Sequence, residues 1–215
     1  KVDVSQRNIK LTNLAVGQTP QNVIVDGKFK KVDELAVTIN NLLEKHNFAA
    51  RDVVTSVSGE EVIIRVTDIP NIPKEELDEV IRWEANEQIP LPVDEMILDY
   101  EIVTEKSDGG YEIMLVAVKE EIISSYLEVF EQVGLNPVAI EIEPLAIARI
   151  LKLIYPQETI AVVDIGSKTT DVSVFSRGKF LFTRSLEIGG DDITNDVADI
   201  YQLEMSAAEE YKKSN

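Results

Sequence analysis

The 215-residue chain contains no cysteine and only one histidine, His46. Without cysteine, a disulfide framework, a cysteine-ligated zinc site and a cysteine nucleophile are all excluded. A single histidine argues against a Ser-His-Asp triad and excludes a metal site built from several histidines. Basic residues are also scarce, since 21 Lys and Arg face 39 Asp and Glu, for a formal net charge of −18. Proteins bind nucleic acid and anionic lipid through clustered positive charge, so we expect neither ligand here.

Long hydrophobic runs are missing as well. The longest uncharged apolar runs fall well short of the roughly 20 residues that a transmembrane helix needs. No signal-peptide pattern opens the chain. If the protein works at a membrane, we therefore expect another protein to hold it there. The apolar fraction of the sequence, 44%, and its charged fraction, 28%, are typical of a folded globular chain.

The pattern of apolar residues predicts an α/β chain in three parts: 1–67, 68–142 and 143–215. In the first part we expect a helix over 33–47 and a hairpin of two β-branched runs, 53–57 and 62–66. In the middle part, a proline-containing connector leads into an α+β insert. Its predicted elements are a helix over 74–88, strands over 96–103 and 111–118, a helix ended by Gly134, and a strand over 136–142. The apolar face of that second helix is predicted to be Ile123, Tyr126, Leu127 and Phe130.

The last part is predicted to hold a helix over 145–155 and then a three-strand meander. The strands are expected at 159–163, 170–175 and 180–186, with a tight turn at Ser176-Arg-Gly-Lys179. Two helices follow, one from Ile193 with Val197, Ile200 and Tyr201 on one face, and one from Ser206.

The chemistry-bearing motif lies in this meander, at Val162-Val-Asp-Ile-Gly-Ser-Lys-Thr-Thr-Asp171. An apolar strand delivers Asp164, and Gly166 lets backbone N–H groups approach an anion closely. Thr169 and Thr170 can donate hydroxyl hydrogens to phosphate oxygens, and Asp164 suits a hydrated Mg²⁺. An ordinary hairpin with a polar turn would give the same local pattern. Gly189-Gly190, at the start of the next helix, favours the phosphate interpretation because a second backbone segment could approach the same ligand.

Together these motifs resemble the actin/Hsp70/sugar-kinase superfamily. The segment 164–171 resembles its second phosphate motif, Gly189-Gly190 its following glycine pair, and Ala208-Glu-Glu-Tyr-Lys212 its nucleoside-contacting helix. The segment Trp83-Glu-Ala-Asn-Glu-Gln-Ile-Pro-Leu-Pro92 resembles the PilM family of type IV pilus assembly proteins, which are relatives of the cell-division protein FtsA. Val25-Asp-Gly27 and Phe182-Thr-Arg-Ser-Leu-Glu-Ile-Gly-Gly190 are similar to that family too.

The resemblance implies an actin-like (ribonuclease H-like) lobe with a small α+β insert, and binding of ATP with Mg²⁺. The cofactor-binding residues that it implies are Asp164, Gly166, Ser167, Lys168, Thr169, Thr170, Gly189, Gly190, Glu209 and Lys212, with Asp164 also serving the metal. The family's first phosphate loop is expected before Lys1 or, in degenerate form, at Asp3-Val-Ser-Gln-Arg-Asn-Ile-Lys-Leu11. The second lobe is expected beyond Asn215. Nucleotide binding is therefore expected of a longer chain, and weak or no binding of these 215 residues alone.

The resemblance further implies a cytoplasmic scaffold at the inner face of the cytoplasmic membrane. An N-terminal peptide of a PilN-like inner-membrane protein would recruit it, docking between the core and the insert. The helix over 74–88 and the strands after it are the insert surfaces expected to line that groove. The resemblance also allows contacts with pilus motor ATPases, self-association and slow ATP hydrolysis.

Three alternatives share the fold: a small-molecule kinase or ATPase, an FtsA-type division protein, and a type II secretion platform protein. A kinase needs a base within reach of its acceptor hydroxyl, and the only candidates in the motif are Asp164 and Asp171. We therefore expect a binding scaffold rather than an enzyme.

Overall fold

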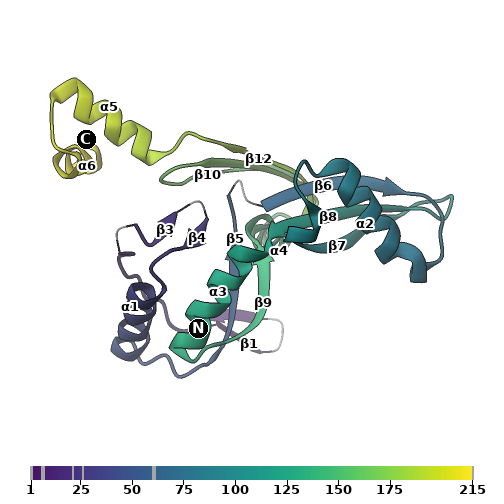
Figure 1. Cartoon of the computed structure of the whole chain (residues 1–215), viewed down its shortest axis with the longest axis horizontal. Coiled ribbons are helices and arrows are strands. Elements are labelled where there is room, and N and C mark those ends of the chain that lie inside the picture. Colours follow the sequence, from purple (N-terminus) through teal and green to yellow (C-terminus); the bar gives the residue numbers. More distant parts are fainter. Residues whose placement is uncertain (1, 6–7, 21, 26, 60–61, 215) are drawn as a thin grey trace. The chain divides into compact units, whose positions relative to one another are not determined.

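A computed structural model of the chain describes residues 2–5, 8–20, 22–25, 27–59 and 62–214. The chain divides into two compact units, residues 1–141 and 142–215 (Figure 1). Gln6, Arg7 and Asp26, which belong to motifs discussed above, and residues 60–61 of the predicted hairpin turn lie outside the described residues.

The first unit contains most of the strands. They are β1 (Val2–Ser5), β2 (Asn8–Leu11), β3 (Ile24–Val25), β4 (Lys28–Phe29), β5 (Asp52–Val57), β6 (Val62–Ile69), β7 (Met96–Glu105), β8 (Tyr111–Lys119) and β9 (Asn136–Ile142). The helices are α1 (Val32–Lys45), α2 (Leu77–Gln88) and α3 (Glu120–Val133), with short 3₁₀ turns η1 (Lys74–Glu76) and η2 (Val93–Glu95). The predicted helix over 74–88 is thus η1 followed directly by α2.

The main core of this unit lies between α2 and an antiparallel sheet in the order β6-β8-β7 (Figure 1). The central strand β8 places Ile113, Leu115 and Ala117 against α2, all at most 1% exposed. From α2, Leu77, Ile81 and Ala85 pack into the same cluster, at the spacing of one helix face. Pro90 follows α2 closely, and because proline cannot continue a helix, it suits this boundary.

A second cluster joins α3 to α1 and to β4. Its buried members are Ala36, Val129 and Val133, and Phe29 packs against them. Helix α3 ends at Gly134 in the left-handed conformation (φ 68°), as predicted, because glycine adopts that conformation at no steric cost.

The predicted face of α3 is wrong by one position. The buried residues are Ile122, Ser125, Val129 and Val133, whereas the predicted Leu127 is 44% exposed. The face turns inward at Ser125 because its hydroxyl is fully bonded: it donates to the Ile122 carbonyl at 2.7 Å and accepts from the Phe29 amide at 3.3 Å.

The predicted hairpin of 53–57 and 62–66 is also wrong. Strand β5 pairs with β9, and β6 pairs with β8. The Asn136 amide donates to the Arg51 carbonyl at 2.8 Å, and the Asn136 side chain bonds Asp52 at the same distance. Two β-branched runs around a Ser-Gly turn match a hairpin locally, but a distant strand provides the actual partner.

These pairings bear on the edges of the predicted insert. Strand β6 begins at Val62, before the predicted boundary at 68, and belongs to the same sheet as β7 and β8. At the other edge, α3 packs on α1 and β9 pairs with β5. The composition changes near Asp68 because the proline-containing connector begins there. The sheet β6-β8-β7 begins earlier in the chain, so the two boundaries do not coincide. The division into 1–67, 68–142 and 143–215 stays a prediction.

The second unit begins with α4 (Glu143–Ile154) and continues into the predicted antiparallel meander of β10 (Thr159–Ile165), β11 (Thr170–Ser176) and β12 (Lys179–Leu186). Arg177 and Gly178 both have positive φ, as a two-residue hairpin turn of the type that matches strand twist requires. Helices α5 (Gly190–Tyr201) and α6 (Met205–Ser214) complete the unit.

Helix α5 begins three residues earlier than predicted and buries a different face. Thr194 and Ala198 are buried, whereas the predicted Ile200 and Tyr201 are exposed. The small residues turn inward because α5 packs against α6, where Ala208 is fully buried. Within the described part of the chain, no helix has the length and apolarity needed to cross a membrane.

Candidate functional site

The predicted phosphate motif forms a short loop between β10 and β11, which we call the glycine loop (residues 166–169). The Gly166 amide donates to the Thr169 carbonyl at 2.8 Å, which closes the turn. A Cβ at Gly166 would lie 3.1 Å from the same carbonyl oxygen, so a larger residue would require the loop to shift by a few tenths of an ångström. Ser167 and Lys168, at the tip of the loop, are exposed to solvent.

The second glycine segment lies directly against this loop. A Cβ at Gly189 would be 2.5 Å from the Ser167 carbonyl oxygen, closer than real Cβ contacts occur. The Gly190 amide donates to the Gly166 carbonyl at 2.9 Å, and the Asp191 amide donates to the Ser167 carbonyl at 2.7 Å. The first amides of α5 therefore hold the glycine loop in place and are not presented to a ligand.

The two threonines of the motif have different surroundings. The Thr170 hydroxyl donates to the Ile188 carbonyl at 2.7 Å, so it fastens β11 to the segment before the glycine pair. Within the described residues, the Thr169 hydroxyl contacts Asp171 alone, at 3.5 Å, which is the outer limit of a hydrogen bond. Thr169 is therefore the better placed of the two to donate to a bound anion.

Asp164 lies near the exposed end of β10, where Asp171 is its directly opposite partner on β11. Like charges in this position repel each other, and a divalent cation would relieve the repulsion. No group of three Asp, Glu or His side chains in the described residues is arranged as a metal site. A metal held at Asp164 would therefore need phosphate and water oxygens as further ligands, which Mg²⁺ prefers.

Glu209 and Lys212, one turn apart on α6, reach the start of α5. The Lys212 ammonium contacts Glu209 Oε2 at 2.6 Å and the Gly190 carbonyl at 2.9 Å. Thr194 donates to the same Glu209 oxygen at 2.6 Å. The Lys212 and Thr194 hydrogen bonds lower the pKa of Glu209 to about 2, so its carboxylate remains ionised far below neutral pH.

The fold therefore brings most predicted site residues together, through the contacts of the glycine loop with Gly189-Gly190 and of Gly190 with α6. Thr194 was not predicted. A threonine inside a helix is usually predicted to lie on the surface. The sequence signal that could have identified Thr194 is its position one turn after the glycine pair.

A separate pocket of about 760 Å³ lies in the first unit. Strand β4, turn η2, the end of β8 and helix α3 line it, and α2 contributes no lining residue. We call it the acidic pocket because five carboxylates and two lysines line it among the residues that the structure describes. These charged residues are Asp94, Glu95, Glu120, Glu121, Glu128, Lys28 and Lys119.

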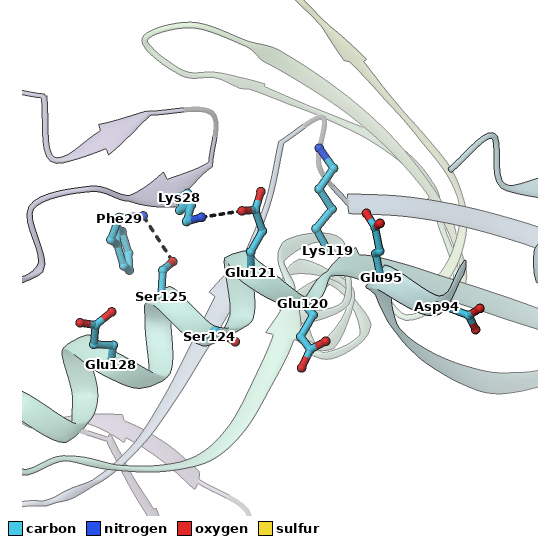
Figure 2. Close-up of a pocket in the computed structure, with 10 residues that line it drawn as sticks. All are labelled: Lys28, Phe29, Asp94, Glu95, Lys119, Glu120, Glu121, Ser124, Ser125 and Glu128. Carbon is cyan, nitrogen blue, oxygen red and sulfur yellow. Dashed lines mark hydrogen bonds and ion pairs between the residues drawn. The ribbon is translucent and has the colours of Figure 1, made fainter. Parts of the chain in front are cut away.

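One wall of the acidic pocket is held together across 93 residues of sequence (Figure 2). Lys28 donates to Glu121 at 2.5 Å, and this contact lowers the pKa of Glu121. Beside it, the Phe29 amide donates to Ser125, and the Phe29 and Tyr126 rings lie at a tilt of 35° with centroids 4.3 Å apart. The pocket wall is therefore structurally fixed, and its excess negative charge favours a basic ligand.

Comparison with known proteins identifies the family. All 215 residues match the family model described as type IV pilus assembly protein PilM. The chain belongs to the PilM family. A solved structure described as the PilM-PilN type IV pilus biogenesis complex superposes with a TM-score of 0.89 and 32% identity, covering 99% of this chain and 65% of that chain.

More distant relatives share the fold. Cell division protein FtsA of Bacillus subtilis is 24% identical over 229 residues, covering 94% of the PilM-family chain and 52% of FtsA. The structure of ethanolamine utilization protein EutJ from Carboxydothermus hydrogenoformans has a TM-score of 0.52 at 19% identity, covering 89% of this chain and 49% of that chain. The chain thus spans about half the length of FtsA. The predicted family and the predicted actin-like fold class are confirmed.

Proposed function

We propose that the chain is part of a nucleotide-binding scaffold of type IV pilus assembly, which a PilN-like inner-membrane protein recruits to the cytoplasmic face of the membrane. Membership of the PilM family is the observation that carries this proposal. The similar solved structure, described as a PilM-PilN complex, supports the choice of partner.

The nucleotide part of the proposal rests on the glycine loop. The loop is fixed by Gly189 and α5, and its exposed tip can meet phosphate oxygens through Ser167, Lys168 and Thr169. When bound, Mg²⁺ would neutralise phosphate charge, and Asp164 would hold it directly or through water. The role proposed for the site is binding, because a kinase would also need a placed acceptor and base.

The nucleotide proposal can be tested by calorimetry of ATP binding to a chain extended at both ends to the length of its relatives. Gly166→Val should abolish binding because its side chain would meet the Thr169 carbonyl. Asp164→Ala should weaken binding mainly when Mg²⁺ is present. Unchanged ATP affinity in both variants would show that the loop is not the phosphate site.

For the partner, we propose that the N-terminal peptide of the PilN-like protein docks in the acidic pocket. The pocket is large enough for several side chains, and its carboxylates favour a basic residue beside the peptide's apolar anchors. Phe29 is the large apolar side chain among the residues that line the pocket, and such an anchor could pack against it.

Fluorescence anisotropy with the labelled peptide tests this docking. Glu95→Lys and Glu128→Lys, which reverse charge in the lining, should each weaken binding about tenfold or more. Glu204→Lys makes the same charge change on the second unit and serves as the matched control. Equal losses in all three variants would mean that overall charge, and not the acidic pocket, attracts the peptide.

A further inference from the structure

Helix α2 carries the single tryptophan of the sequence, Trp83, on its outer surface. The buried side of the helix consists of Leu77, Ile81 and Ala85. Trp83 follows Ile81 by two positions, which is about 200° around a helix, so its side chain points away from the core. The residue is 60% exposed, whereas tryptophan is highly buried on average. The core beneath α2 is therefore complete without the indole ring.

Two glutamates lie beside Trp83, one turn before it and one turn after it. Glu79 and Glu87 are each four residues away, a spacing that makes side chains neighbours on a helix surface. Both glutamates are exposed. We call Glu79, Trp83 and Glu87 the tryptophan stripe, which extends about 12 Å along the helix. It places an aromatic ring between two negative charges.

Other charged groups of α2 already have partners inside the first unit. These contacts join Tyr100 to Asp78 at 3.1 Å, Gln88 to Glu84 at 2.7 Å and Arg82 to Asp94 at 3.4 Å. In the part of the chain that the structure describes, no basic side chain pairs with Glu79 or Glu87. The tryptophan stripe therefore keeps both of its carboxylates available to a cation from outside.

The chemistry of the stripe favours a cationic partner. Tryptophan is the best aromatic ring for cation–π contact, and the planar guanidinium of arginine stacks on such rings. Because α2 is convex, a partner that follows the whole stripe is most simply a second helix packed along it. Basic residues that repeat every four positions of that helix lie about 6 Å apart, as the residues of the stripe do.

We propose that the tryptophan stripe is a docking surface for a basic helix of a partner protein. An arginine of that helix stacks on Trp83, and basic residues one turn to either side pair with Glu79 and Glu87. Interface residues that contribute most to binding are enriched in tryptophan and arginine. The acidic pocket is a different surface, since α2 contributes none of its lining residues, so this inference does not depend on the peptide docking proposed above.

The first test uses a synthetic alanine-rich helical peptide with arginine at every fourth position. The same peptide with glutamine in place of arginine is its control. Because Trp83 is the single tryptophan, its fluorescence reports contact at the stripe directly. At about 150 mM salt, where distant charges are largely screened, the arginine peptide should change the emission and the glutamine peptide should not. Unchanged emission with the arginine peptide would overturn the inference.

Fluorescence anisotropy of the labelled arginine peptide measures its affinity for variants of the 215-residue chain. Trp83→Ala should weaken binding about tenfold, and Trp83→Phe should weaken it less, because a smaller ring still faces the cation. Glu79→Gln and Glu87→Gln should each weaken binding about threefold. Circular dichroism should show the same helix content in all four variants, since the altered side chains are exposed. Full affinity in Trp83→Ala would contradict the proposed contact.

Two control variants test whether the stripe itself is the site. Glu204→Gln removes an exposed carboxylate from the second unit, and Glu128→Lys reverses a charge in the acidic pocket. Neither should weaken binding as far as the stripe variants do. A loss in Glu204→Gln equal to that in Glu79→Gln would show that net charge alone attracts the peptide. A loss in Glu128→Lys equal to that in Trp83→Ala would place the peptide in the acidic pocket, and either result would overturn the inference.

Discussion

At the scale of single residues, two small residues make contacts that larger or apolar residues could not make. Gly189 allows two backbone segments to touch, and Ser125 places a hydroxyl inside an apolar helix interface. Both residues are small, and both act through backbone groups of a distant segment. Each gives a prediction that a matched variant can isolate.

Gly189→Ala should destabilise the second unit by about 1–3 kcal/mol, the usual range for overpacking. Its φ of −149° is open to any residue, so the effect would come from the added Cβ, 2.5 Å from the Ser167 carbonyl oxygen. Urea denaturation followed by circular dichroism measures the loss. Gly17→Ala is the control, since a Cβ there meets only the Leu42 side chain at 3.3 Å. Equal stability of the two variants would contradict the close contact at Gly189.

Ser125→Ala should cost about 1–3 kcal/mol, because the Phe29 amide would lose its acceptor in a partly buried place. Ser124→Ala makes the same change of helix propensity one residue earlier, at an exposed position. The difference in unfolding free energy between the two variants isolates the buried hydroxyl. If Ser124→Ala costs as much, the hydroxyl of Ser125 contributes nothing.

At the scale of elements, local sequence patterns were sufficient to predict some strands and helices but not the partners or buried faces of others. The meander of β10, β11 and β12 could be predicted because its turns and alternating residues are all local. The partner of β5 could not, because β9 lies some 80 residues later and pairs equally well by composition. The face of α3 was missed because Ser125 counts as polar until its bonding partner on β4 is known.

The candidate site shows the same division. The glycine loop and the Gly189-Gly190 pair could be predicted, because both are short motifs with a physical reason for each glycine. Thr194 could not, because its importance depends on Glu209, which reaches it from another helix. The acidic pocket could not be predicted either, since Lys28 and Glu121 meet across 93 residues.

The sheet β6-β8-β7 gives a prediction at this scale. Ile113→Ala on β8 should cost about 2–5 kcal/mol, because the residue is fully buried in the cluster beneath α2. Ile97→Ala, on the neighbouring strand β7, is the control, since Ile97 is 44% exposed. Thermal and urea unfolding measure both. Similar costs at the two positions would mean that α2 does not cover β8.

At the scale of the whole molecule, the net charge of −18 dominates long-range interactions. Charge of one sign attracts a basic partner before contact and speeds association. Five of the carboxylates lie in the lining of the acidic pocket, where the attraction would be directed.

The association rate of a basic N-terminal peptide should therefore fall about tenfold or more as salt rises from about 10 mM to about 150 mM. The dissociation rate should change much less. Stopped-flow fluorescence measures both rates, and a peptide with its basic residues neutralised is the control. A salt-independent association rate would mean that electrostatic steering plays no part in recruitment.

The pairing of β5 with β9 has a consequence for the order in which the chain folds. Closing a loop of about 80 flexible residues costs roughly 4 kcal/mol in chain entropy. The sheet β6-β8-β7 lies within that loop, and its register places Val62 opposite Val118, so its two ends emerge side by side. Once this sheet has formed, a short turn and the segment that contains α3 are all that separate β5 from β9, so a large part of the entropy cost has already been met. The sheet β6-β8-β7 should therefore form before β5 pairs with β9. This part of the chain should fold from its middle outward.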